Sequence, residues 1–83
     1  MNKILVEIYL PAARRSYDVY IPFRCKLHEI LGLLAASLTE LSEGYFKAAE
    51  DIVICERVTG TIFNINMSAE ELGLYNGSKL MLI

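Results

Sequence analysis

The sequence predicts an α+β domain in which one amphipathic helix packs on a mixed sheet of four to five strands. Three observations lead to this prediction. Apolar and polar residues alternate near both ends of the chain, an apolar stripe of helical period occupies the middle, and turn-forming residues separate the segments. Because the 83 residues contain no linker, repeat or low-complexity tract, we expect a single domain over residues 1–83.

The first two strands are predicted over residues 3–10 and 16–22. In the first strand, one face carries Ile4, Val6, Ile8 and Leu10, and the other carries Lys3, Leu5, Glu7 and Tyr9. In the second strand, the inward set is Tyr17, Val19 and Ile21, and the outward set is Asp18 and Tyr20. Pro11 ends the first strand, since proline cannot donate to a ladder. Two alternating runs this close together indicate an antiparallel hairpin.

The helix is predicted between Leu27 and Gly44, where the apolar period changes to three and four residues. Its stripe consists of Leu27, Ile30, Leu31, Leu34, Leu38 and Leu41. Gly44 stands where a residue with positive φ can follow a helix. No capping residue directly precedes Leu27, so we expect a frayed first turn. Tyr45 and Phe46 are expected to tuck under the helix end rather than to form a binding anchor.

The second half of the chain contains shorter elements. Two strands are predicted over residues 52–55 and 61–65, with a turn at Thr59-Gly60. Ser68 and Glu71 fit a capping box at the start of a single helical turn. A last strand follows over residues 78–83, with Leu80 and Leu82 inward. Because its apolar pattern is the densest, we expect it in the middle of the sheet, beside the first strand.

Composition excludes several classes of function. The net charge of −2 gives no basic stripe for nucleic acid, and the one basic pair, Arg14-Arg15, falls in a turn. No apolar run reaches the roughly 18–20 residues that span a bilayer. Glu7 interrupts the amino-terminal segment, so no signal peptide is expected and we predict a cytoplasmic protein without membrane insertion. Cys25 and Cys55 are too far apart for a CxxC motif and are expected to stay reduced.

The residue pattern does not indicate catalysis, a metal site or a cofactor. His28 is the only histidine and has no partner at a suitable spacing. Acidic pairs such as Glu40 and Glu43 are typical of a solvated surface. The chain contains neither a glycine-rich phosphate loop nor a Gly-x-Ser-x-Gly elbow. We therefore predict a protein that is not an enzyme and uses no cofactor.

The predicted interaction surface is the sheet face that the helix leaves uncovered. Side chains that alternate with the inward set point to this face. From the run after Asp51, either Ile52 with Ile54 or else Val53 is expected to join it. The predicted patch comprises Leu5, Tyr9, Tyr20, Ile52, Ile54, Met81 and Ile83. A contiguous apolar patch commonly marks a protein interface, whereas scattered exposed apolar residues are ordinary.

The segment Gly-Leu-Tyr-Asn-Gly-Ser-Lys-Leu, residues 73–80, resembles the final turn and strand of ubiquitin-like domains. With the helix stripe and the element order, the chain resembles a ubiquitin-like (β-grasp) domain over essentially its full length. It is most similar to the YukD-like (EsaB-like) family of type VII secretion accessory proteins. The resemblance implies a protein-interaction module, acting as a cytosolic accessory or regulatory component of a type VII (ESX-like) secretion system. Its partner would be a component of the secretion machinery.

Two alternatives to this role stay open. Ubiquitin-like modifiers and sulfur carriers end in a flexible diglycine tail, because only glycines let the backbone pass through the channel of an activating enzyme. The sequence contains no Gly-Gly, so we expect a module that is not conjugated, unless a diglycine is missing from its carboxyl end. The second alternative is a self-associating assembly module, in which the patch closes a homo-oligomer.

Overall fold

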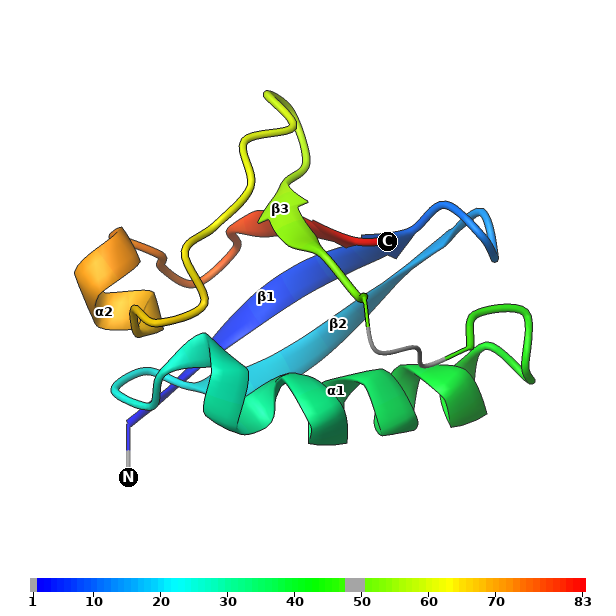
Figure 1. The fold of residues 1–83 in the computed structure, drawn as a ribbon, viewed down its shortest axis with the longest axis horizontal. Coiled ribbons are helices and arrows are strands. Elements are labelled where there is room, and N and C mark those ends of the chain that lie inside the picture. The colour runs from blue at the N-terminus through cyan, green and yellow to red at the C-terminus, as the bar shows by residue number, and fades with distance from the viewer. Residues whose placement is uncertain (1, 48–50) are drawn as a thin grey trace.

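The computed structural model describes residues 2–47 and 51–83 as a sheet with a helix laid across one face (Figure 1). The elements are β1 (Lys3–Leu10), β2 (Arg15–Pro22), α1 (Leu27–Leu41), β3 (Ile54–Glu56), α2 (Ala69–Leu72) and β4 (Lys79–Leu82). Within the described residues the sheet has four strands, the lower number of the predicted range. The predicted α+β class is confirmed.

The sheet is mixed, with the strand order β2-β1-β4-β3. β1 pairs antiparallel with β2 and parallel with β4, and β3 pairs antiparallel with β4. The turn before β4 is fastened to β1: the Leu5 N–H donates to Asn76 Oδ1 at 2.8 Å, and the Gly77 N–H donates to the Leu5 carbonyl at 2.8 Å. Gly77 has a φ of 93°, a conformation that glycine adopts without strain. The last strand therefore lies in the middle of the sheet, as predicted.

The hydrophobic core fills the space between α1 and the sheet. Its buried members include Ile4, Val6, Ile8, Leu10, Ile21, Leu34, Leu38, Leu80 and Leu82. The predicted stripe of α1 is wrong at Leu41, which is exposed because it is the last helical residue. Phe46 closes the core at this end instead, and its N–H donates to Ser42 Oγ at 3.0 Å. Tyr45 is exposed, so only Phe46 tucks under the helix.

The first turn of α1 is held by the loop before α2, which corrects the prediction of a frayed start. Lys26 is the N-cap and its side chain makes no capping hydrogen bond. The N–H groups of Leu27 and His28 instead donate to the carbonyls of Met67 and Ile65, each at 3.0 Å. Lys26 Nζ also donates to the Asn66 carbonyl at 3.0 Å. Distant backbone carbonyls thus satisfy donors that a local side chain usually caps.

The segment between β3 and α2 differs from the prediction of a strand over residues 61–65. Only Ile62 pairs, in an isolated bridge with Cys55. The Asn64 side chain accepts a hydrogen bond from the Asn66 N–H at 2.9 Å, and this local turn redirects the chain. The predicted capping box of α2 is confirmed, because Ser68 and Glu71 exchange side-chain to backbone hydrogen bonds.

Candidate protein interface on the open sheet face

The sheet face turned away from α1, here called the open sheet face, is the candidate site. Strand register brings its side chains together: Leu5 lies opposite Tyr20, and Tyr9 lies opposite Met81. Leu5, Tyr9 and Met81 are half-buried, whereas Tyr20 is 68% exposed. The inward neighbours on β1 and β4 are buried, so alternation along these strands sorts the side chains between the two faces.

Two residues of the predicted patch do not lie on this face. Ile54 pairs with Leu82, points into the core and is 1% exposed. Ile52 also packs against the core. Val53 is the residue that faces outward beside β4, since its N–H and carbonyl pair with those of Ile83. Of the two alternatives left open for this run, the structure has Val53 on the open sheet face, and the predicted pair Ile52 and Ile54 is corrected, because successive residues of a strand point to opposite faces.

A band of charge crosses the middle of the open sheet face. Glu7 lies opposite Asp18 on one side and Lys79 on the other. Arg57, from the loop after β3, reaches over this band: its Nη1 lies 3.2 Å from Glu7 Oε1, and its guanidinium carbon lies 4.5 Å from the centroid of the Tyr9 ring. The apolar side chains therefore form two clusters, one at Leu5 and one near Tyr9, separated by charged groups.

The loop after β3 covers the β3 end of this face. Cys55 lies opposite Met81 but is buried, and its thiol contacts the Met81 carbonyl at 3.6 Å. Burial, and then the nearby carboxylate of Glu56, raise the pKa of the Cys55 thiol. Glu56 accepts hydrogen bonds from the N–H and hydroxyl of Thr59, at 2.6 and 2.8 Å. These bonds fix the turn from which Arg57 extends across the sheet.

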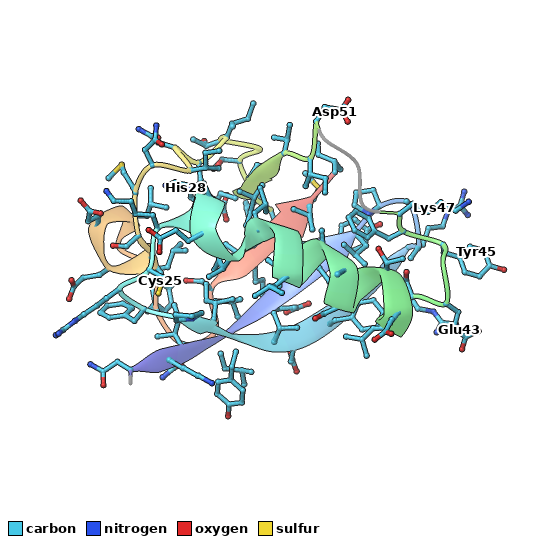
Figure 2. All side chains as sticks on the ribbon, turned by 60° about the horizontal axis from the view of Figure 1, so that its bottom comes forward. Cys25, His28, Glu43, Tyr45, Lys47 and Asp51 are labelled. Carbon is cyan, nitrogen blue, oxygen red and sulfur yellow. The ribbon has the colours of Figure 1, made fainter. Side chains whose placement is uncertain are left out.

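The other candidate residues do not gather into a site. Cys25 and His28 lie near the start of α1, and both cysteines are free thiols (Figure 2). Glu43 and Tyr45 lie at the opposite end, where Tyr45 points away from the fold (Figure 2). Among the described residues, no group of three His, Cys, Asp or Glu side chains could hold a metal ion. No helix within the described part of the chain is long and apolar enough to cross a membrane.

Sequence reasoning missed Arg57, the residue that divides the open sheet face. Arg57 lies in a loop, and strand periodicity gives no information on where a loop side chain reaches. Leu33 was also missed: it is an apolar residue outside the helical stripe and is 76% exposed. The signal for Leu33 was present, because a leucine between stripe positions of an amphipathic helix is expected at the margin of the buried face.

Comparison with known proteins finds matches among solved structures. No family model matches the sequence, and no curated protein matches it either. The chain is similar to the ubiquitin-like domain of the Mycobacterium tuberculosis type VII secretion system protein ECCD1, with a TM-score of 0.83, 21% identity, and coverage of 100% of this chain and 99% of that one. It is also similar to the EccD5 ubiquitin-like domain from Mycobacterium xenopi, with a TM-score of 0.84, 18% identity, and coverage of 100% and 94%.

A third similar structure is a chain of the MycP5-free ESX-5 inner membrane complex, with a TM-score of 0.72 and 18% identity. The match covers all of this chain and 21% of that one. These similarities agree with the observed helix on a mixed sheet whose first and last strands are central neighbours. The chain therefore has the ubiquitin-like, β-grasp fold.

Proposed function

We propose that this chain is a protein-interaction module of a type VII secretion machinery, acting in the cytoplasm without enzymatic activity and without covalent conjugation. The proposed docking surface is the open sheet face. It consists of Leu5, Tyr9, Tyr20, Val53, Met81 and Ile83, with Arg57 between its two apolar clusters. The partner is a protein component of the secretion machinery, and the role is that of an accessory or regulatory subunit.

One observation carries this proposal: a sheet face that no helix of the described residues covers presents tyrosine and methionine side chains around Arg57, which pairs with Glu7. Tyr, Met and Arg are enriched at protein interfaces, where they provide large contact areas and directed polar bonds. Tyr20 and Ile83 are exposed at opposite ends of the face, so a partner could contact both clusters. The printed names of the similar structures, which belong to type VII secretion proteins, support the choice of partner.

Site-specific photo-crosslinking in the native host tests the proposal. A photoreactive amino acid is placed at Tyr20 or Ile83 on the open sheet face, and at Val58, an exposed loop residue, as the control. We expect the first two positions, and not Val58, to crosslink to a component of the secretion machinery. Met81→Asp, in a chain shown by circular dichroism to be folded, should abolish the crosslink. Crosslinks absent from both sheet positions would contradict the proposal.

The two alternatives have their own measurements. A homo-oligomer that uses the open sheet face would dissociate on dilution in sedimentation experiments, and Met81→Asp would make it monomeric. A modifier or sulfur carrier would appear in the intact mass of the native gene product as an extension that ends in Gly-Gly. Either result would replace the proposed role with one that the sequence also left open.

A further inference from the structure

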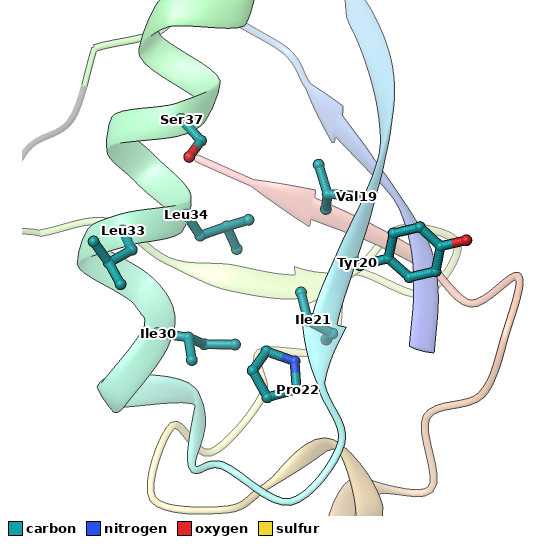
Figure 3. A pocket seen from close by; sticks show the side chains of 8 residues that line it. All are labelled: Val19, Tyr20, Ile21, Pro22, Ile30, Leu33, Leu34 and Ser37. Carbon is teal, nitrogen blue, oxygen red and sulfur yellow. The ribbon is translucent and has the colours of Figure 1, made fainter. Parts of the chain in front are cut away.

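An apolar groove of about 220 Å³ lies between β2 and α1, beside Leu33 (Figure 3). Its lining includes Ile21, Ile30, Leu33 and Leu34, and only Tyr20 and Ser37 contribute hydroxyl groups. The lining side chains include no carboxylate, thiol or imidazole, so the two hydroxyls are its only polar groups. A chemically reactive pair of residues lies elsewhere, in the turn between α2 and β4.

This turn contains Asn76-Gly77, the dipeptide in which an asparagine side chain cyclises most readily with the backbone. The other asparagines of the chain, Asn2, Asn64 and Asn66, precede lysine, isoleucine and methionine. A side chain on the following residue hinders the approach of its backbone nitrogen to the asparagine Cγ, and glycine has no side chain. Asn76 is therefore the asparagine of this sequence best suited to react with the main chain.

Hydrogen bonds, rather than burial, hold this turn. Asn76 and Gly77 are exposed, and a Cβ added at Gly77 would meet no atom within 4 Å beyond its chain neighbours. The Leu5 N–H donates to Asn76 Oδ1 and the Gly77 N–H donates to the Leu5 carbonyl, each at 2.8 Å. The Tyr75 N–H donates to Ser78 Oγ and the Ser78 N–H donates to the Tyr75 carbonyl, each at 3.0 Å. Water can thus reach a turn that is fastened to β1.

We propose that Asn76 is a site of spontaneous deamidation, at a rate set by opening of the hydrogen bonds between this turn and β1. The Gly77 nitrogen attacks Cγ of Asn76, so that an N–Cγ bond forms and the Cγ–Nδ2 bond breaks. The proton of the Gly77 nitrogen leaves with the amide group as ammonia. Water then hydrolyses the succinimide: cleavage of the new bond gives aspartate, and cleavage of the original peptide bond gives isoaspartate. This site goes beyond the proposed docking function and does not depend on it.

The closed turn disfavours the first step. The Gly77 nitrogen has to lose the proton that it donates to the Leu5 carbonyl, and has to leave the ladder to reach Cγ. The Leu5 N–H polarises the side-chain carbonyl of Asn76, but it also keeps that group turned toward β1. Because both bonds have to break, the reaction proceeds through a local opening. The same opening exposes the Gly77 amide to hydrogen exchange.

The two products should act differently on the junction of β1 and β4. Aspartate keeps the length of the backbone and retains an oxygen that can accept the Leu5 N–H. Isoaspartate places an additional methylene in the main chain just before Gly77. The Gly77 N–H and the Ser78 carbonyl, which pair with Leu5 and with the Glu7 N–H, then cannot both keep their register. We expect isoaspartate, and not aspartate, to loosen the start of β4 from β1.

Mass spectrometry of the full chain, incubated at neutral pH, tests the proposal. The reference is a synthetic peptide of residues 73–80, which lacks the bonds to β1. We expect Asn76 to convert more slowly in the folded chain than in the peptide, by about the factor that protects the Gly77 amide from hydrogen exchange. Conversion as fast as in the peptide, or no conversion over a time in which this factor predicts it, would overturn the proposal.

A substitution in the turn tests the dependence on opening. Ser78→Ala removes the acceptor of the Tyr75 N–H without altering Asn76 or Gly77, and should speed conversion in the folded chain by about threefold or more. The peptide with the same change should convert at the rate of the parent peptide. Ser37→Ala, at an exposed position of α1, is the matched control and should leave the rate unchanged.

Equal rates in Ser78→Ala and Ser37→Ala would contradict control by the turn. If Ser78→Ala does not fold, the parent chain in urea below its unfolding transition serves instead, and conversion should rise in step with exchange of the Gly77 amide. Asn76→Asp separates the two products: it should unfold at nearly the same urea concentration as the parent, and a chain enriched in isoaspartate should unfold at a lower one. Equal stability of the isoaspartate chain and Asn76→Asp would contradict the expected effect on the junction.

Discussion

At the residue scale, Arg57 links the loop after β3 to the centre of the open sheet face. Its guanidinium pairs with Glu7 and lies over the ring of Tyr9. A double-mutant cycle with Arg57→Met and Tyr9→Leu should give a coupling free energy of about 0.5–1 kcal/mol, typical of an exposed cation–π pair. Urea denaturation measures it. The more exposed pair of Arg24 and Glu70 is the control, and little coupling is expected there. Strictly additive changes in the free energy of unfolding for Arg57→Met and Tyr9→Leu would contradict a contact between the two side chains.

A second residue-scale prediction concerns pH. The hydrogen bonds that Glu71 accepts from Ser68 lower the pKa of its carboxyl below the ordinary value of 4.5. The carboxylate therefore stabilises the fold fully above pH 4.5, and this contribution is lost as pH falls through the lower pKa of the folded state. Unfolding measured from neutral pH to about pH 3 should show a smaller decline for Glu71→Gln than for the parent chain.

The cap itself makes a third prediction. Ser68 is buried, and its side chain accepts the Glu71 N–H at 3.1 Å. Ser68→Ala should lower the free energy of unfolding by about 1 kcal/mol at neutral pH, the usual cost of losing an N-cap. Ser37→Ala, at an exposed position of α1, is expected to change it by much less. Equal effects of the two substitutions in urea titrations would show that the capping bonds contribute little.

At the scale of elements, α1 depends on a distant loop for its beginning. Because the Leu27 and His28 amides donate to Met67 and Ile65 carbonyls, they should exchange with solvent slowly, as helix-interior amides do. Amide hydrogen exchange followed by nuclear magnetic resonance checks this. Glu29, whose N–H donates to the Lys26 carbonyl within the same turn, gives a local comparison. Exchange of Leu27 and His28 at the rate of an unfolded peptide would show that the start of α1 frays.

Elements with a clear period were predictable, and those defined by long-range partners were not. β1, β2, α1 and β4 follow alternation or a helical stripe, and the α2 cap follows from two residues in sequence. The start of α1 required knowledge of the loop carbonyls at residues 65 and 67. The predicted strand over residues 61–65 failed because the side chain of Asn64 forms a local turn that no apolar pattern reveals.

The candidate interface was likewise predictable where its residues lie on regular strands, and not where they lie on loops or on a very short strand. The faces of Leu5, Tyr9, Tyr20 and Met81 follow from alternation along well-defined strands. Ile54 could not be assigned, because β3 has only three residues and every residue of the run 52–55 is apolar. Arg57 and the groove beside Leu33 arise from the packing of separate elements. Their positions depend on loop paths and on the angle at which α1 crosses the sheet, and neither is encoded in a local period.

At the scale of the whole molecule, the two sides of β4 should differ sharply in their tolerance to substitution. Leu80 is completely buried between the sheet and α1, so Leu80→Ala should cost about 2–5 kcal/mol. Met81 points to the open sheet face, and Met81→Ala should cost about 1 kcal/mol or less. Thermal or urea denaturation of both variants measures the difference. A cost for Met81→Ala that equals the cost for Leu80→Ala would contradict the central placement of β4 with alternating faces.

The parallel pairing of β1 with β4 has a consequence for synthesis in the cell. The hydrogen bond from Leu5 to Asn76 joins residues 71 positions apart. A growing polypeptide on the ribosome therefore has no partner for the inner edge of β1 until residues 76–82 have left the exit tunnel. Contacts this distant in sequence slow folding. The hairpin of β1 and β2 is expected to wait with the inner edge of β1 unpaired, a period in which a chaperone could bind this edge.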